Sequence, residues 1–169
     1  LNTGVDKLLE EAILLNRREI VSKLIKIVMD VNETPWKTKH KLPPVFLACH
    51  FGHYDVLEEI LEDTKVNLQN EKKNLLHQVQ MNENVSFGDR LKCFNLIIND
   101  SRCTSDMINC LDSEGNSPIS YSLKYGHKEI TTQLIQHGAK MCDENIESDE
   151  SKSLLKSCIN EYMITNELK

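Results

Sequence analysis

The chain has 169 residues, of which 40% are hydrophobic and 5% aromatic, enough to bury the core of one domain. It contains no apolar run long enough to cross a membrane as a helix, so we expect no membrane contact. The formal net charge of −6 and the sequence pI of about 5.5 argue against a nucleic-acid-binding surface, which needs a basic face, and favour a basic partner.

The cysteines show no sign of a disulfide or metal framework. They are Cys49, Cys93, Cys103, Cys110, Cys142 and Cys158, and no two of them form a C-x-x-C pair. Free thiols in a reducing compartment are the simplest interpretation, so we expect a cytoplasmic chain or the cytosolic part of a membrane protein. The sequence opens on Leu1 rather than Met, which suggests a piece of something longer.

The first segment, residues 6–30, has apolar residues at helical spacing that are interrupted at Asn16. Asn is the residue next to Gly in tolerating a left-handed turn, so we expect two short helices joined there. Residues 31–42 are polar and contain Pro35, which predicts a loop. The only tryptophan, Trp36, lies in this loop and has two interpretations: a cover over the edge of the core, or an exposed anchor for a partner.

A second pair of helices is predicted from Pro44 onwards. Pro44 suits the first position of a helix, Gly52 and His53 form the next turn, and a second helix follows from Val56. A third pair is irregular: Asn74 precedes its first helix, and its second helix is expected at residues 91–98. The segments 82–89 and 99–106 are then insertions, and extra loop length in such proteins often marks a functional face.

The fourth segment, 112–141, has the clearest signals. Asp112 and Gly115 favour a tight turn, because Asp can bond its own backbone and Gly can take a positive φ. Ser117 is the expected N-cap of a helix, Gly126 ends it, and Gly138 ends the next one. After it, residues 143–151 are acidic and read as a loop, and 152–168 have helical periodicity.

The fourth segment resembles an ankyrin repeat, whose family pattern is D-x-x-G-x-T-P-L-H-x-A-A-x-x-G-H-x-E-I-V-x-L-L-x-x-G-A. The matching positions are Asp112, Gly115, Pro118, Gly126, His127, Glu129, Ile130, Leu134, Gly138 and Ala139. The resemblance implies an all-α solenoid of stacked helix–turn–helix units with short β-turn fingers. It implies a single domain over 1–169 with four to five repeats, at about 6–32, 39–68, 71–109, 112–141 and a partial or capping 143–169.

No catalytic constellation stands out, and we expect neither an enzyme nor a cofactor. Cys49, His50 and His53 could suggest a thiol–imidazole pair or a zinc site, but they lie where the repeat pattern already expects helix and turn, and no second ligand pair appears. Cys103 is the candidate reactive thiol, because it lies in an insertion beside Arg102, where exposure and a nearby cation would favour the thiolate.

Binding of another protein is the function that the resemblance implies. Ankyrin proteins generally bind partners through the β-turn fingers and the groove-facing side of the first helices. The corresponding candidates, with Trp36, are Lys39, His40, Leu42, His50, Phe51, Met81, Asn82, Ser113, Glu114, Asn116, Lys124 and Tyr125. Phe51 and Tyr125 occupy the same place, immediately before the Gly-His pair, where an aromatic side chain has no core to fill.

Three settings for such a module remain open. The degraded repeats, the insertions and the non-Met start resemble the cytoplasmic amino-terminal part of ankyrin-type transient receptor potential channels, which implies a role in channel regulation or assembly. The alternatives are a small soluble inhibitor, similar to the ankyrin inhibitors of Rel transcription factors or to host-directed mimics, and a substrate-recruiting adaptor. An incomplete solenoid also exposes an apolar end, which predicts self-association as a further property.

Overall fold

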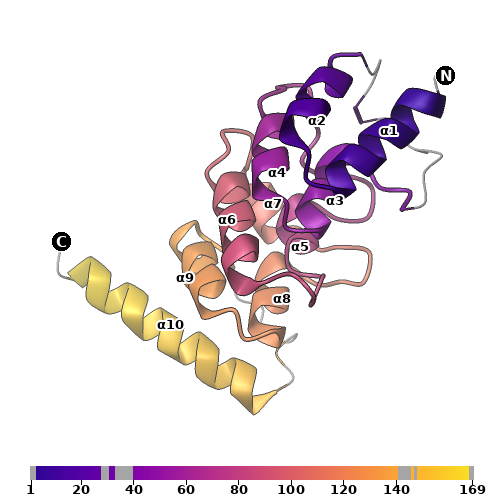
Figure 1. The fold of residues 1–169 in the computed structure, drawn as a ribbon. Helices are drawn as coiled ribbons and strands as arrows, with labels where there is room; N and C mark the ends of the chain where they lie inside the picture. Colours follow the sequence, from indigo (N-terminus) through magenta and orange to yellow (C-terminus); the bar gives the residue numbers. More distant parts are fainter. Residues whose placement is uncertain (1–2, 28–30, 33–39, 141–145, 147, 168–169) are drawn as a thin grey trace. The chain divides into compact units, whose positions relative to one another are not determined.

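The computed structural model describes residues 3–27, 31–32, 40–140, 146 and 148–167. In that part of the chain the regular elements are helices, joined by turns and loops (Figure 1). Within these residues the backbone forms no β-strand, only one isolated bridge between Gln69 and Asn74. The helices are α1 (Thr3–Leu14), α2 (Arg18–Ile25), α3 (Pro44–His50), α4 (Tyr54–Leu61), α5 (Leu75–Gln78), α6 (Phe87–Ile98), α7 (Ser105–Asn109), α8 (Pro118–Lys124), α9 (Lys128–Gln136) and α10 (Asp149–Glu167). The expected all-α class is therefore confirmed. None of the described helices is both long and apolar enough to span a bilayer.

The helices belong to two compact units. The first comprises Leu1–Leu68 and Asn82–Leu96, and the second comprises Gln69–Met81 and Ile97–Lys169. The repeat boundaries given above are not tested by this division and remain a prediction.

The first unit is built from two antiparallel helix pairs that stack on each other. Helix α1 packs on α2 and α3, and α4 packs on α2 and α3. The fully buried side chains of this unit come from all of these helices and from α6: Leu9, Ile13, Val21, Phe46, Leu57, Ile60 and Phe94. Residues 33–39 lie outside the described part, and with them Trp36 and Lys39.

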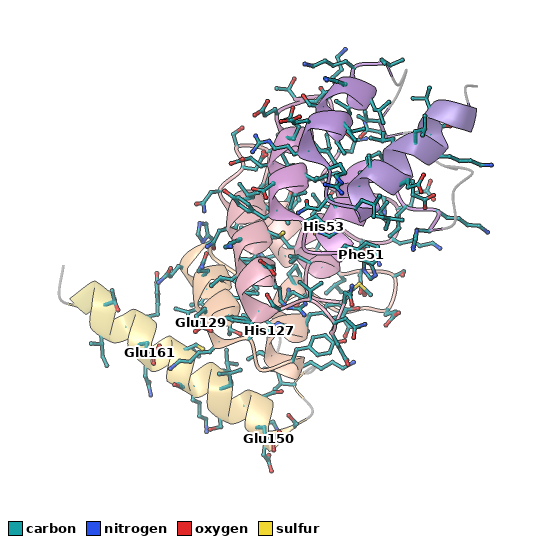
Figure 2. The ribbon with its side chains drawn as sticks, viewed as in Figure 1. Phe51, His53, His127, Glu129, Glu150 and Glu161 are labelled. Carbon is teal, nitrogen blue, oxygen red and sulfur yellow. The ribbon has the colours of Figure 1, made fainter. Side chains whose placement is uncertain are left out.

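The second unit has a complete helix pair covered on one side by a long helix. Helices α8 and α9 pack on each other, α5 packs on α8, and α10 packs on both α8 and α9. Its fully buried side chains include Leu75, Leu76, Ile97, Ile130, Leu134 and Cys158. An ion pair from Lys128 on α9 to Glu161 on α10 lies on the surface of this contact; Figure 2 shows Glu161 on that helix.

The third repeat is irregular, as expected, and its second helix begins earlier than predicted. Its first helix, α5, is a single turn in the second unit, whereas most of its second helix, α6, belongs to the first unit. Helix α6 begins at Phe87 and not at residue 91, so part of the presumed insertion 82–89 is helical. The Ser86 hydroxyl accepts a hydrogen bond from the Asp89 backbone amide and donates one to the Asp89 carboxylate. This cap starts the helix earlier than predicted.

Two other predicted loops are also ordered. The presumed insertion 99–106 ends in helix α7, whose N-cap Thr104 accepts the amide of Met107. The last helix begins at Asp149 rather than residue 152, because the Ser148 hydroxyl accepts the amide of Ser151. The acidic stretch before α10 is therefore partly helix, and acidic residues in a first turn suit the positive end of the helix dipole.

Candidate partner-binding surface

The turn between the two helices has the same geometry in three repeats. Asn16, Gly52 and Gly126 take φ values of 51°, 68° and 69°. In each case the amide of the next residue bonds a carbonyl five residues earlier, as in the bond of His53 to Ala48. This is the Schellman end of a helix, and it confirms that Asn16 occupies the place of the glycine. The residue before each turn therefore points away from the helix pair's core.

Phe51 lies at this position in the first unit, half-buried among imidazole rings. Its ring centroid lies 5.5 Å from that of His40 and 5.0 Å from that of His50, both edge-on, and 6.0 Å from that of His53, which is stacked. His53 also bonds the carbonyl of Leu14 at 3.1 Å, which ties this turn to the end of α1. Figure 2 shows Phe51 and His53 close together where α3 leads into α4.

His40 fixes the other side of this cluster. Its Nδ1 lies 2.9 Å from the Glu10 carboxylate, and its backbone amide donates to the same oxygen at 3.1 Å. The neighbouring Lys41 takes a positive φ of 51°, which turns the chain towards α3, and Leu42 is half-buried. The sequence-predicted residues His40, His50 and Phe51 are therefore together.

Tyr125 has the same kind of surroundings in the second unit. Its ring stacks on Tyr121 at 6.3 Å and lies 5.8 Å from the ring of His127. The ammonium group of Lys124 lies 5.6 Å from the Tyr125 centroid, which is within cation–π range. The Tyr121 hydroxyl donates to Asp112 at 2.7 Å, so burial and this bond raise the pKa of Tyr121. The predicted pair Lys124 and Tyr125 is thus in contact.

The β-turn finger of the fourth repeat is held by its aspartate. The Asp112 carboxylate accepts the amides of Glu114 and Asn116, as expected, and Gly115 takes a φ of 83°. Ser113 donates its amide to Lys72 in the preceding turn at 2.8 Å. Ser113 and Glu114 are exposed on this finger and Asn116 is half-buried, so a partner can reach the finger's tip.

The third repeat reaches this finger through a histidine. His77 Nε2 lies 3.1 Å from the Asn116 carbonyl, and Asn74 Oδ1 accepts the amides of Leu76 and His77. The side-chain nitrogen Nδ2 of Asn74 donates to the Met107 carbonyl at 2.6 Å. Asn74 therefore supplies the N-cap at the position where the family pattern has Thr. Burial lowers the pKa of His77. Its imidazole has a structural role, through its contact with the Asn116 carbonyl.

Two predicted binding residues have other roles. The Asn82 side chain donates to the His50 carbonyl at 2.9 Å, so it caps the end of α3. The Met81 sulfur lies 3.2 Å from Lys73 Nζ, which ties it to the neighbouring turn. Their side chains are half-buried and serve the fold, which weakens the prediction that they contact a partner.

The insertion is an ordered wall of a groove within the first unit. The Arg90 guanidinium, almost wholly buried, donates to the carbonyls of Asn82 and Val85 at 2.7 and 3.3 Å. Val85 packs so close to Gly52 that a Cβ there would lie 2.4 Å from its Cγ1. The groove has a volume of about 830 Å³, with Phe51 and His53 on one side and Val85 and residues of α6 on the other.

The surroundings of Cys103 do not favour the thiolate form on which its predicted reactivity depends. The Arg102 side chain that was expected to stabilise a thiolate instead pairs with Asp100, at 2.6 and 2.8 Å. Burial and the Asp100 charge raise the pKa of Cys103 to about 11, so the thiol form dominates at neutral pH. Cys49, Cys93 and Cys158 are buried, and Cys142 lies outside the described residues.

Sequence reasoning missed two features. Leu15 occupies the place of Phe51 and Tyr125, and its side chain is 60% exposed; aligning Asn16 with Gly52 and Gly126 would have found it. The side chains of Asn32 and Asn109 each form hydrogen bonds with the two backbone groups that flank one residue of the next repeat. For Asn32 these groups are the Lys65 carbonyl and the Asn67 amide. The recurring Val-Asn and Ile-Asn dipeptides carried that signal. Among the described residues no three potential ligands gather as a metal site.

Comparison with solved structures identifies the fold. The chain superposes on the ankyrin repeat domain of Bcl-3, a member of the IkappaB protein family, with a TM-score of 0.62 and 17% sequence identity. The match covers 78% of this chain and 55% of that one. This protein has the ankyrin-repeat fold. No protein-family model matches the sequence, and a search of curated proteins gave no match.

Proposed function

We propose that this ankyrin-repeat chain is a non-enzymatic protein-binding module, and that the partner contacts the ends of the first helices and the β-turn fingers. The observation that carries this proposal is the recurrence of one local arrangement. In two repeats an aromatic side chain, Phe51 or Tyr125, lies half-buried immediately before a turn, against the histidine that follows the turn. Such rings are already held in place, so a partner gains contact area at little entropic cost.

The chemistry around each ring supports contact with a polar, partly aromatic partner surface. Phe51 is bordered by imidazole edges, and Tyr125 is bordered by an ammonium group and a second tyrosine. Aromatic side chains of this kind are over-represented among the residues that dominate interface energies. Exposed Ser113 and Glu114 add hydrogen-bonding groups at the finger. Cys103 has no part in this proposal.

A capture experiment tests the binding surface. The full chain, the double variant Phe51→Ala/Tyr125→Ala and a control variant Glu129→Ala/Gln136→Ala are immobilised and exposed to source-cell lysate. Both control positions are exposed and lie on α9, a second helix. We expect the wild type and the control to capture the same protein and the aromatic variant to lose it, with unchanged circular dichroism. Equal capture by the aromatic variant would refute the proposed surface.

The setting of the module is a narrower part of the proposal. We infer a role either in regulation or assembly of a cation channel or as a soluble inhibitor or adaptor, both from sequence resemblance. The two differ in an observable way: a channel subunit is recovered with membranes after cell fractionation and its transcript encodes several apolar spans, whereas an inhibitor or adaptor is recovered in the soluble fraction. The capture experiment applies to both settings.

A further inference from the structure

The outward side of α1 and α2 carries large apolar side chains that nothing in the described chain covers. Leu8 on α1 is 56% exposed. Ile20 on α2 is 50% exposed, and Ile27, two helical turns later in the turn that follows α2, is 63% exposed. We call Leu8, Ile20 and Ile27, with the half-buried Leu24 between the last two, the α1/α2 face. Large apolar side chains that are exposed on neighbouring helices are typical of an interaction surface.

The repeats themselves show what kind of surface the α1/α2 face is. With Asn16, Gly52 and Gly126 superposed in sequence, Ile20 corresponds to Val56 and Ile130, both of which are 0% exposed. Leu8 corresponds in the same way to Pro44 and Pro118, which are buried. In the first unit those positions are covered because α1 packs on α3 and α2 packs on α4. The α1/α2 face is therefore a repeat-stacking face without its neighbour among the described residues.

One residue on this face departs from the stacking pattern. Glu11 stands where the later repeats have the buried Leu47 and Tyr121, and it is exposed. A helix pair stacked as in those repeats would bury the Glu11 carboxylate under apolar side chains, which is costly. Lys7, one turn earlier on α1, is exposed as well. The face thus carries an acid and a base, which can pair across a two-fold axis.

A second pair of charged side chains lies beside the apolar residues of α2. Glu19 and Lys23 on α2 are exposed, lie one turn apart and are again of opposite sign. With Lys7 and Glu11 they give the face two positive and two negative side chains. The chain as a whole carries a charge of −6 and would repel a second copy, but this face is locally balanced and complementary to itself.

We propose that two copies of this chain associate through their α1/α2 faces in an isologous dimer. The apolar residues of the two faces pack together, and Lys7 of each copy pairs with Glu11 of the other. In a two-fold interface every such pair occurs twice, so both acids that burial would isolate receive a cation. This inference is independent of the proposed partner-binding role, because Phe51 and Tyr125 are not part of the face.

Sedimentation of the full chain over a wide range of protein concentration tests this inference. We expect reversible dimerisation of the wild type, and loss of the dimer in Ile20→Glu, whose exposed side chain can be replaced without disturbing the core. The matched control is Ile164→Glu, at an isoleucine on α10 that is 59% exposed. This control variant is expected to dimerise like the wild type. A wild type that stays monomeric, or an Ile20→Glu variant that still dimerises, would overturn the proposal.

Charge exchange tests the arrangement of the two copies. Lys7→Glu and Glu11→Lys should each weaken the dimer, because either one places two like-charged pairs in the interface. The double exchange Lys7→Glu/Glu11→Lys should restore it, and an equimolar mixture of the two single variants should form a heterodimer. If neither the double variant nor the mixture dimerises better than the single variants, the isologous pairing is wrong. The Phe51→Ala/Tyr125→Ala variant should dimerise normally, which separates this test from that of the partner-binding surface.

Discussion

Replacing the equivalent glycines Gly52 and Gly126 by alanine distinguishes two contributions to the free energy of unfolding. One is the left-handed backbone of the repeat turn, and the other is the packing of the segment 82–89 on that turn. Gly52 and Gly126 have φ values of 68° and 69°, and an added Cβ at Gly126 meets no atom within 4 Å. At Gly52 it would lie 2.4 Å from Val85 Cγ1. The two sites therefore differ in one respect, which is whether the insertion loop packs on the turn.

The expected magnitudes follow from general values. A left-handed backbone costs an L-residue about 1–2 kcal/mol, and the reduced freedom of the unfolded chain offsets about 0.4–1 kcal/mol of that. Gly126→Ala is therefore expected to lower the free energy of unfolding by about 1 kcal/mol. Gly52→Ala has the same turn cost, and overpacking against Val85 adds about 1–3 kcal/mol, for a total of about 2–4 kcal/mol.

Urea denaturation followed by circular dichroism measures both losses. A third measurement, Gly52→Ala in a Val85→Ala background, should bring the cost at Gly52 down to that at Gly126, because the atom that an added methyl group would strike has been removed. Equal costs for the two single variants would refute the reasoning, since they would show that the loop carrying Val85 does not rest on the turn. The groove beside Phe51 would then lose one of its walls.

Two further predictions concern the third repeat. Asn74→Ala removes a buried cap and the short hydrogen bond from Asn74 to the Met107 carbonyl, so it should destabilise the chain by about 2–4 kcal/mol. Asn70 is exposed and also accepts two amides, and Asn70→Ala should cost under about 1 kcal/mol in the same urea titration. Because burial lowers the pKa of His77 in the folded chain, the unfolded chain binds the proton at higher pH, and stability should fall as pH decreases through the ordinary imidazole value of about 6.5. His77→Gln should flatten that dependence, and an unchanged slope would contradict the assignment.

The features that could be predicted from sequence are those decided by a few neighbouring residues. A positive φ is adopted readily by Gly and, among the other residues, most often by Asn, so Asn16, Gly52 and Gly126 marked the turns directly. Ser117 was recognised as an N-cap for a similar reason, because its hydroxyl accepts an amide three residues away. The helix pairs and their repeat pattern follow from such local signals.

The features that were missed depend on contacts between residues far apart in the chain. Asn82 caps a helix that ends at His50, and Arg90 holds the loop that rests on Gly52. Composition marked this segment only as an insertion. Cys103 shows the same limit at short range: Arg102 is its neighbour in sequence, yet the guanidinium is bound by Asp100. Adjacency therefore gave the wrong charge for the thiol's surroundings.

The strongest support for a binding surface comes from what the turn does to the residue before it. A left-handed residue reverses the chain, so the residue that precedes it ends the first helix and cannot enter the core between the two helices. That residue is Leu15, Phe51 or Tyr125, and Leu15 is 60% exposed while the two aromatic residues are half-buried. Outside the α1/α2 face, exposed positions on the helices of these repeats include polar residues such as Asp55 and Lys124. Large side chains at three equivalent positions outside the core between the two helices support the proposal that these positions contact another molecule.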